Sequence, residues 1–474
     1  MKVVIVGCGT GGIATAIELI NKGFNGNNII MIDKGQMINK RKCFVNANTP
    51  CKKCKVCSIV HGCGGSGSFS DSKLNFDPTG KVGGDLYELL TQEEIVEYLK
   101  KTYKIYQQFG IEEFQSKIYG LNHNEEALKI IEKINKNKNM TMADCVTMHL
   151  GSDNSRIVYK RMLDYLIDNG VKIISRAEMI DMDVKDKVIK YKYNNIIIEQ
   201  SYDKLVLAMG RVGGSFIRTI CKQNNIQMKN GKIQYGLRIE TLNEYMKPLN
   251  DNFYEAKVYL KGRFGDETRV FCTNVGGIVS IESYPYLDGS IYLANGHSYA
   301  SKDMKTDNTN FALLVSRSFN DDTPNPLDDY LYPLIKATNS LGYGSVVFQS
   351  LKDIRLNRRS TEERIKKLDI IPTAKAYAGD LTSIVPFRIM LDILEAIEEL
   401  DKICPGLNGD NTLLYGMEAK FSTNKVLINK NCKTSNKDIY CIGDCSGFSR
   451  GITGAFSMGI IVAENILRGD DINA

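Results

Sequence analysis

A glycine-rich turn near the N-terminus has the spacing that holds two phosphate groups. It reads Gly7-Cys8-Gly9-Thr10-Gly11-Gly12, which is the G-x-G-x-x-G pattern. Gly7 permits a tight turn, Gly9 lets the backbone approach a pyrophosphate, and Gly12 allows a helix to pack closely on a strand. The N–H groups and positive dipole end of the following helix attract the anion. We therefore expect dinucleotide contacts from Gly7, Gly9, Thr10, Gly11 and Gly12.

The elements around this turn are those that its chemistry requires. Residues 3–6 are a short run of Val and Ile, typical of a buried parallel strand, and residues 13–21 have helical periodicity. A second strand over 29–32 ends in Asp33 and Lys34, and Asp33 stands twenty-six residues after Gly7. A carboxylate there can accept hydrogen bonds from ribose hydroxyls and disfavours a 2′-phosphate. The glycine pattern alone is weak evidence, but this order of elements favours a dinucleotide-binding domain over a plain glycine turn.

The C-terminal end distinguishes between classes of dinucleotide enzyme. Residues 438–442 read as a strand that ends in Gly443-Asp444, and Gly451, Ile452 and a helix over 456–467 follow. In this segment the chain resembles the glutathione-reductase-like class of FAD enzymes, whose closing strand comes from the far end of the chain. The resemblance implies that FAD is the cofactor, that Asp444 contacts the ribityl chain, and that the last helix points its N-terminus at the flavin O2. A helix dipole there would stabilise a reduced, anionic flavin.

The same resemblance implies the fold class and the domain organisation. The expected fold is α/β, with a discontinuous Rossmann-like FAD-binding domain, a central parallel sheet and a three-stranded crossover, joined to an α+β substrate or cap domain. A helix over 156–169, a strand over 171–174 and strands over 184–193 and 196–200 fit the crossover, and a strand over 204–207 with Gly210 fits the return to the dinucleotide. The FAD-binding domain is expected over 1–90, 150–215 and 408–474. Residues 91–149 are then a mostly helical cap segment, and residues 216–407 a substrate domain.

Several further stretches resemble an uncharacterised family of bacterial and archaeal FAD-dependent dehydrogenases, a group with a single dinucleotide-binding domain. These stretches are residues 51–60, 62–74, 235–240, 271–272, 295–298, 308–313 and 416–420. Cys63, Ser72 and Lys420 depart from the aromatic residue, Gly and Arg that are usual in the family. Its substrates are not established, so the resemblance implies a cofactor but no particular reaction.

Candidate flavin contacts lie in the glycine-rich loop over 62–73. A backbone that must approach a planar ring needs such residues, so we expect Gly65, Ser66, Gly67 and Ser70 at the isoalloxazine, and Lys73 is a catalytic candidate. The alternative is a flexible hairpin with solvated side chains.

Three other positions are candidates for contact with a substrate or a proton. His297, in a polar turn after a strand over 291–293, suits proton transfer, although a lone histidine is more often structural. Arg450 either binds an anionic substrate or only caps and pairs. Arg238 and Glu240, on a strand, either face solvent or form ion pairs.

Four cysteines have metal-like spacing: Cys43, Cys51, Cys54 and Cys57. The C-x2-C-x2-C run is the opening of a [4Fe-4S] site, and a tetrahedral zinc site would use the same thiolates. The surrounding lysines also favour a redox-active dithiol, and free thiols that only pack are the remaining alternative. The sequence leaves these alternatives open.

Composition limits the remaining function classes. The 61 basic and 55 acidic residues leave a formal charge of +6, and scattered lysines give nucleic-acid binding little support. The chain has no long apolar run and no signal-peptide pattern, and its 13 cysteines are unevenly spaced, so we expect a cytoplasmic protein without a membrane partner. The expected function is hydride transfer between flavin N5 and a small-molecule substrate, with a nicotinamide or a ferredoxin as electron partner. The alternatives are an iron–sulfur flavoprotein that transfers electrons, and a non-redox scaffold that binds flavin or RNA.

Overall fold

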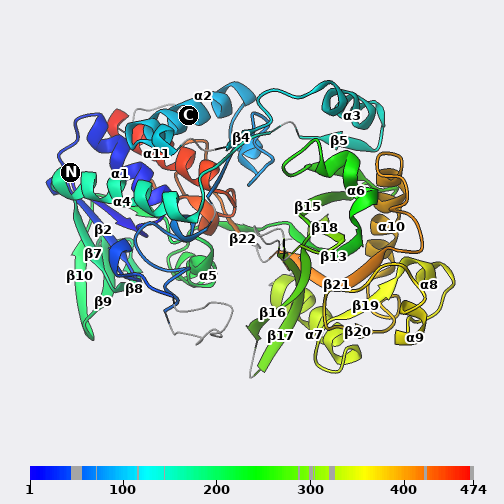
Figure 1. The fold of residues 1–474 in the computed structure, drawn as a ribbon. Helices are drawn as coiled ribbons and strands as arrows, with labels where there is room; N and C mark the ends of the chain where they lie inside the picture. The colour runs from blue at the N-terminus through cyan, green and yellow to red at the C-terminus, as the bar shows by residue number, and fades with distance from the viewer. Residues whose placement is uncertain are drawn as a thin grey trace. The chain divides into compact units, whose positions relative to one another are not determined.

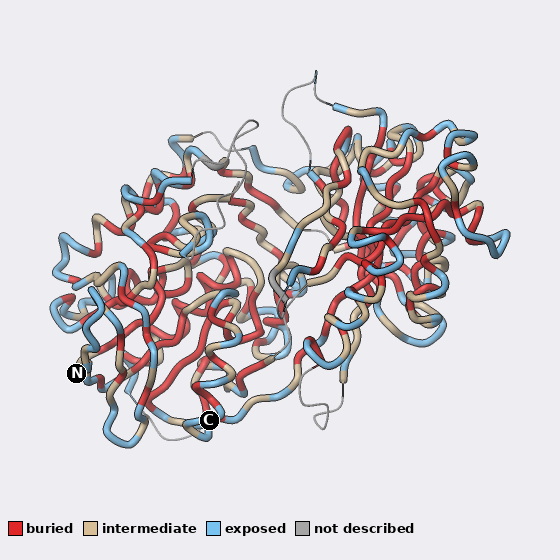
Figure 2. The backbone as a smooth tube through the Cα atoms, turned by 90° about the horizontal axis from the view of Figure 1, so that it is seen from below, coloured by how far each residue is buried: buried red, intermediate tan, exposed pale blue. Residues whose placement is uncertain are grey.

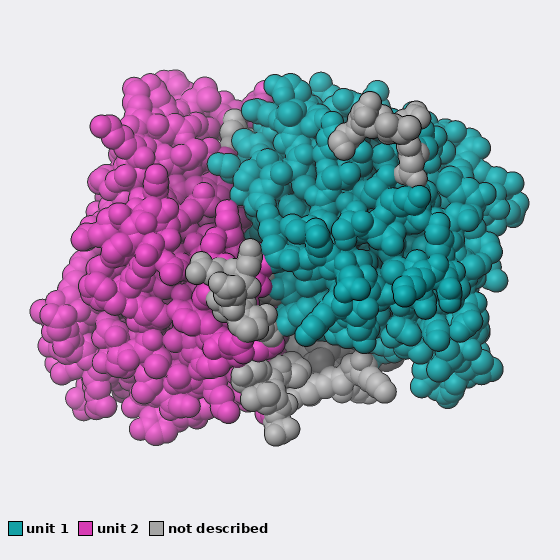
Figure 3. Space-filling view, turned by 180° about the vertical axis from the view of Figure 1, so that it is seen from behind, with its two compact units in different colours: residues 1–119, 145–229, 424–474 teal, residues 120–144, 230–423 magenta. Residues whose placement is uncertain are grey.

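The computed structural model describes residues 1–43, 56–70, 72–114, 117–143, 145–286, 289–297, 303, 305–319, 326–420 and 424–469. The chain forms two compact units (Figure 3). Unit 1 comprises Met1–Tyr119, Cys145–Lys229 and Asn424–Ala474, and unit 2 comprises Gly120–Asp144 and Asn230–Thr423. Buried segments run through the interior of each unit (Figure 2). The division places residues 91–119 with the N-terminal sheet and residues 408–420 with unit 2.

A five-stranded parallel sheet forms the centre of unit 1 (Figure 1). Its order is β23–β11–β1–β2–β7, with β1 at Val3–Val6, β2 at Ile29–Asp33, β7 at Lys172–Ser175, β11 at Lys204–Leu207 and β23 at Ile439–Cys441. Every neighbouring pair in it is parallel. Val3 and Ile5 face one hydrophobic core and Val4 and Val6 face another, as expected for a sheet covered on both sides. The predicted α/β fold is confirmed, including the strand that the C-terminal segment adds to this sheet.

The crossover between β7 and β11 is a three-stranded antiparallel sheet, as predicted. Its first two strands differ from the single strand that was expected over residues 184–193. The strands are β8 at Ala177–Asp183, β9 at Val188–Tyr193 and β10 at Ile196–Ser201. Residues 184–187 form a turn instead of the start of a strand. The Asp183 carboxylate stabilises that turn because it accepts hydrogen bonds from the backbone N–H groups of Lys185 and Asp186, at 2.8 and 3.1 Å.

Helices α1 (Thr10–Asn21) and α11 (Ile452–Arg468) pack against each other in unit 1 (Figure 1). Helix α1 begins three residues earlier than the sequence pattern indicated, and α11 begins four residues earlier. A Cβ atom at Gly459 would lie 2.4 Å from the Gly11 carbonyl oxygen and 2.7 Å from the Ala14 Cβ. The two helices therefore meet where α11 has no side chain. Helices α2 (Gln92–Gln108) and α4 (Ser152–Asp168) contribute to the same core.

The remaining elements of this part of the chain are short. They are α5 at Gly214–Gln223, a three-stranded sheet of β3 (Lys73–Phe76), β6 (Val146–His149) and β4 (Lys117–Tyr119), and a two-stranded sheet of β12 (Met228–Asn230) and β22 (Asn424–Val426).

Unit 2 is built on an eight-stranded, mostly antiparallel sheet. Its order is β20 (Tyr377–Ala378), β19 (Val347–Ser350), β21 (Leu413–Lys420), β13 (Ile233–Leu242), β18 (Asn308–Arg317), β15 (Glu267–Val275), β14 (Val258–Lys261) and β5 (Met140–Met142). The helices are α3 (Glu125–Lys136), α6 (Asn243–Asn250), α7 (Tyr332–Leu341), α8 (Leu351–Arg355), α9 (Glu362–Ile365) and α10 (Phe387–Asp401). One face of the sheet is apolar and packs with α10 in the main core of the unit.

A separate hairpin of unit 2 corrects one expectation about His297. Strands β16 (Ile278–Tyr286) and β17 (Gly289–His297) pair along their whole length, with Asn295 opposite Ser280 and His297 opposite Ile278. Residues 295–297 thus continue a strand and do not form a polar turn, because ladder pairing satisfies their backbone groups.

Among the helices that the structure describes, none is both long enough and apolar enough to cross a membrane.

The contact between α1 and α11 gives the first prediction, which is that Gly459→Ala destabilises the protein. Its methyl group would overlap backbone that belongs to α1, so we expect a loss of about 1–3 kcal/mol in the free energy of unfolding. Chemical denaturation of the purified protein measures this. The matched control is Gly214→Ala in α5, where a Cβ meets nothing within 4 Å. Equal stability of the two variants would show that the helices can separate at no cost.

Candidate functional site

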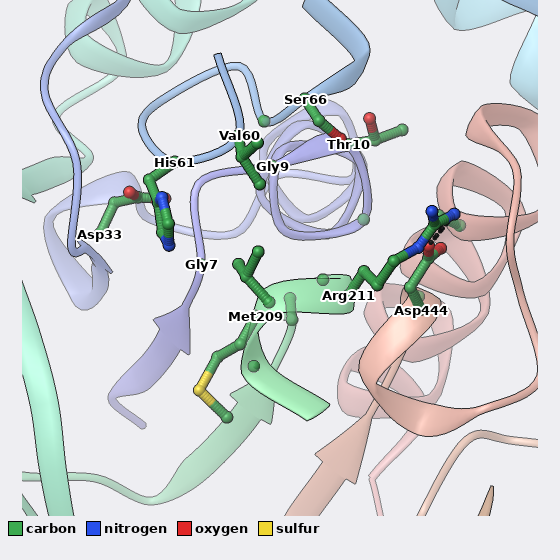
Figure 4. A pocket seen from close by; sticks show the side chains of 18 of the residues that line it. Gly7, Gly9, Thr10, Asp33, Val60, His61, Ser66, Met209, Arg211 and Asp444 are labelled. Atoms are coloured by element: carbon green, nitrogen blue, oxygen red, sulfur yellow. Dashed lines mark hydrogen bonds and ion pairs between the residues drawn. The ribbon is translucent and has the colours of Figure 1, made fainter. Parts of the chain in front are cut away.

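A cavity of about 550 Å³ lies at the carboxyl ends of the parallel strands of unit 1. Residues that follow β1, β2, β11 and β23 line it, and Figure 4 shows how their side chains are arranged. Ligands of open parallel sheets bind at this edge. A volume of this size also falls within the range of about 300–1,000 Å³ that is usual for small-molecule sites.

Most of the predicted cofactor-binding residues line this cavity. They are Gly7, Gly9, Thr10, Gly11, Asp33, Lys34, Gly65, Ser66, Gly67, Ser70, Gly210, Gly443, Asp444, Gly451 and Ile452. Gly12 lies beneath them: a Cβ atom there would come within 2.1 Å of the Gly7 carbonyl oxygen, which explains why helix and strand need a glycine at this point. Whether these residues bind a cofactor stays a prediction.

The three predicted catalytic residues lie in different places. Arg450 lines the cavity. Lys73 is the first residue of β3 and pairs in register with His149, and it is not part of the lining. His297 is exposed at the end of β17 in unit 2. Arg238 and Glu240 are both fully buried, so the solvent-face interpretation of this pair is wrong. Arg238 forms an ion pair with Glu418 instead.

Two helix N-termini without side-chain caps face the cavity. The N-cap residues of α1 and α11 are Gly9 and Gly451, which have no side chain to accept a hydrogen bond from the first turn. Neither first turn contains an acidic residue. The unsatisfied N–H groups and the positive ends of both dipoles are thus directed at one space, and an anion or a carbonyl oxygen of a ligand can accept from them.

Asp33 lies at one end of the cavity, beside His61 (Figure 4). Its carboxylate accepts hydrogen bonds from the backbone N–H groups of Cys8, at 2.9 Å, and Gly35, at 2.8 Å. Burial raises the pKa of this carboxyl, and the two backbone donors oppose the shift. The bonds fix Asp33 against the glycine turn, and each oxygen retains a lone pair for a ligand hydroxyl.

Asp444 lies at the other end of the cavity, opposite Arg211 (Figure 4). The nearest nitrogen of Arg211 is 3.5 Å from the Asp444 carboxylate, and most of the Arg211 side chain is exposed to solvent. Nearby, Arg450 donates to the Asp85 carboxylate at 2.6 Å, and Lys425 pairs with the same group at 2.8 Å. Pairing, one of the two structural alternatives for Arg450, is therefore present.

Arg41 holds the glycine-rich loop of the cavity, and the sequence analysis missed it. The side chain is buried, and its guanidinium donates to a set of acceptors in that loop. These are the backbone oxygens of Ser58, Ile59, Cys63 and Gly65, at 2.8–2.9 Å, the Ser68 hydroxyl at 3.1 Å and the Gly62 backbone oxygen at 3.4 Å. Burial lowers the pKa of Arg41 to about 10, still far above neutrality, so it stays charged. No local pattern marks Arg41, since it lies between two lysines.

A chain of hydroxyl groups supports the first residue of α1. The Thr10 hydroxyl is 2.8 Å from the hydroxyl of Tyr159, which in turn is 3.0 Å from that of Tyr106. Burial raises the pKa of both tyrosines, so both stay protonated. The Thr10 side chain, which lines the cavity, is thereby held in one orientation.

The predicted metal centre is only partly within the described residues. Cys51 and Cys54 lie outside them, while Cys43 is exposed and Cys57 is partly exposed. Among the described residues, there is no group of three or more His, Cys, Asp or Glu side chains that could hold a metal ion. An iron–sulfur or zinc site at Cys43, Cys51, Cys54 and Cys57 therefore stays a prediction.

Comparisons with known proteins give distant similarities. No protein-family model matches the chain. An uncharacterised protein of Clostridium beijerinckii is 24% identical over 493 residues, which cover 99% of this chain and 81% of that protein.

Three solved structures with low sequence identity are similar to this chain over most of its length. Quinol fumarate reductase FrdA of E. coli is 10% identical with a TM-score of 0.40, over 98% of this chain and 69% of its own. A flavoprotein/dehydrogenase from Cytophaga hutchinsonii is 11% identical with a TM-score of 0.36, over 100% and 80%. L-proline dehydrogenase from P. horikoshii is 12% identical with a TM-score of 0.34, over 99% and 93%. Likenesses of this size assign neither a cofactor nor a reaction to this chain.

The hydrogen bonds of Arg41 give the second prediction. Arg41→Met keeps the length of the side chain but leaves several buried carbonyl oxygens without a donor, so we expect the free energy of unfolding to fall by about 3 kcal/mol. Hydrogen–deuterium exchange should also become faster over residues 58–68.

The matched control is Arg156→Met. Arg156 stacks on the same Phe69 ring, at 4.1 Å against 4.0 Å for Arg41, but its side chain is exposed. If both variants change exchange in the loop equally, stacking and not hydrogen bonding holds the loop.

Proposed function

We propose that this chain is an FAD-dependent oxidoreductase, and that the residues lining the cavity of unit 1 would hold the cofactor. The observation that carries the proposal is the meeting of two uncapped helix N-termini at one cavity of a parallel sheet. A ligand that suits both has an anionic group at α1 and a hydrogen-bond acceptor at α11. FAD has both, a pyrophosphate and the pyrimidine edge of the flavin.

The lining of the cavity fits such a ligand. Close backbone approach is possible along its length, since a Cβ atom at Gly9 would meet only the Gly65 Cα, at 3.6 Å. At Gly451, another lining residue, a Cβ atom would meet only the backbone of Gly83, with its Cα at 3.3 Å. Carboxylates stand at the two ends, Asp33 and Asp444, where the ligand offers ribose and ribityl hydroxyls. Acceptors and donors that alternate, from Asp33 through α1 and Asp444 to α11, would match the ribose, pyrophosphate, ribityl chain and flavin O2 of FAD.

Each group of the chain then has a distinct task in binding. The first turn of α1, with the Thr10 hydroxyl, donates to the pyrophosphate, and Asp33 accepts from the adenosine ribose. Asp444 accepts from the ribityl chain, and the first turn of α11 donates to the flavin O2 edge. The loop held by Arg41 brings Gly65, Ser66 and Gly67 to the cavity without bulky side chains, which leaves room for a planar ring.

Bound FAD would supply hydride transfer at N5. The chain's own contribution is to hold the cofactor in one geometry and to place donors where negative charge develops on reduction. His297, Lys73 and Arg450 stay our candidates for proton transfer and substrate contact. A small-molecule substrate and an electron partner of the nicotinamide or ferredoxin type belong to the same proposal.

The third prediction tests the identity of the cofactor. The purified protein should be yellow, and heat denaturation should release FAD and not FMN, because the Asp33 end of the cavity needs a ligand with an adenosine half. Chromatography of the released flavin against FAD and FMN standards decides this, with the heat-treated buffer as blank. Colourless protein that takes up no FAD on incubation would refute the proposal, and release of FMN would refute the role given to Asp33.

A further inference from the structure

One face of the eight-stranded sheet in unit 2 carries charged side chains. On β15, Val270 belongs to the apolar core, so its neighbours Arg269 and Phe271 point to the opposite face. In register across the sheet, Arg269 is paired with Tyr259 on β14 and Leu314 on β18. These residues belong to unit 2 alone, and the inference below does not depend on the proposed function.

The Arg269 side chain is buried without a counter-charge. The residue is 8% exposed, and its Nε makes no hydrogen bond. Its guanidinium carbon lies 4.9 Å from the centre of the Phe271 ring and 5.9 Å from that of Tyr259. No carboxylate of the described residues forms an ion pair with it, including Glu267, two residues earlier on the same face, which is exposed. A guanidinium cannot lose its proton in a protein, so this charge cannot be relieved by titration.

A second cation lies against the same aromatic ring. The Lys420 ammonium, from β21, is 3.0 Å from the centre of the Phe271 ring, so both cations lie within 5 Å of that point. Phe271 can attract each through its ring face, but an aromatic ring brings no net charge. Two cations therefore lie close together at this ring.

The other charged groups of this face are already paired or hydrogen-bonded. Arg238 pairs with Glu418 and donates to Asn310. Burial raises the pKa of Glu418, and Arg238 and Lys420 oppose that shift, so this one carboxylate lies near two cations. Glu240 accepts from Asn308 and Tyr415. Glu255 accepts from the backbone N–H of Cys272 and pairs with Lys257. Among the described residues, none of these acids forms an ion pair with Arg269.

We propose that Arg269, together with Lys420, binds an oxyanion on this face of unit 2. The ligand class is a carboxylate or a phosphate, because the planar guanidinium donates two parallel hydrogen bonds to such a group, and the flanking rings hold its plane. Arg269 is flanked in register by Tyr259 and Leu314, and Tyr259, Phe271 and Lys420 are each partly exposed, so an anion can approach the guanidinium from their side.

The fourth prediction tests this site on the full chain as purified. Calorimetric titration with sodium succinate and, separately, with inorganic phosphate at constant ionic strength should show binding of at least one of them. Arg269→Gln should weaken that binding at least tenfold, and Arg269→Lys, which keeps the charge but loses the fork, should weaken it less. The matched control is Lys367→Gln, which removes an exposed charge elsewhere in unit 2 and should leave binding unchanged.

Two readouts keep the result decisive. Without added anion, Arg269→Gln should raise the melting temperature, because it removes a buried unpaired charge. Stronger binding of succinate than of phosphate assigns the site to carboxylates, and the reverse order assigns it to phosphates. Failure of both anions to bind the wild-type chain, or equal binding by Arg269→Gln, overturns the proposal. Neither outcome concerns the flavin content of the protein, so neither of them tests the proposed function.

Discussion

The contact between helices α1 and α11 is the constraint on which the rest of unit 1 depends. Because Gly459 brings no side chain to the contact, α11 lies against the backbone of Gly11 and the methyl group of Ala14. The two helices come from opposite ends of the chain, and their N-termini open onto the same cavity. Close packing thus brings the positive ends of two separate helix dipoles to one cavity.

The loop over residues 58–68 depends on a second interaction, that of Arg41. Glycine-rich backbone has no side chains with which to build a core of its own, and it loses much conformational entropy on folding. A single buried guanidinium that donates to six acceptors of the loop compensates for this and fixes its course along the cavity. A rigidly held loop that presents small residues such as Gly65, Ser66 and Gly67 to the cavity is what a closely fitting planar ligand requires.

The features that the sequence predicted correctly are those that depend on residues adjacent in the chain. The glycine turn, Asp33 and the Gly443-Asp444 strand end carry their information in adjacent residues, and all of these predicted contacts except Gly12 line the cavity. Hydrophobic runs also predicted the parallel strands, while the turn at Asp183 was missed because its signal is a single side-chain acceptor.

Long-range contacts explain what the sequence did not reveal. Arg41 reaches acceptors seventeen to twenty-seven residues away, and Arg238 meets Glu418 across 180 positions, so neither partner is visible in a local pattern. A strand with alternating Arg, Ile and Glu looks like a solvent face, although tertiary packing buries both charged residues. The cysteines at 51 and 54 lie outside the described residues, and their role is still the prediction made from their spacing.

The central claim is that one extended cavity binds both halves of FAD, and a competition titration tests it most directly. Flavin-free protein is titrated with FAD while quenching of flavin fluorescence is followed, and the titration is repeated with ADP or FMN present. The account predicts that FAD binds with one site per chain and that ADP competes with it, because the α1 and Asp33 end recognises the adenosine diphosphate half. FAD binding that FMN reverses while ADP has no effect would contradict the account.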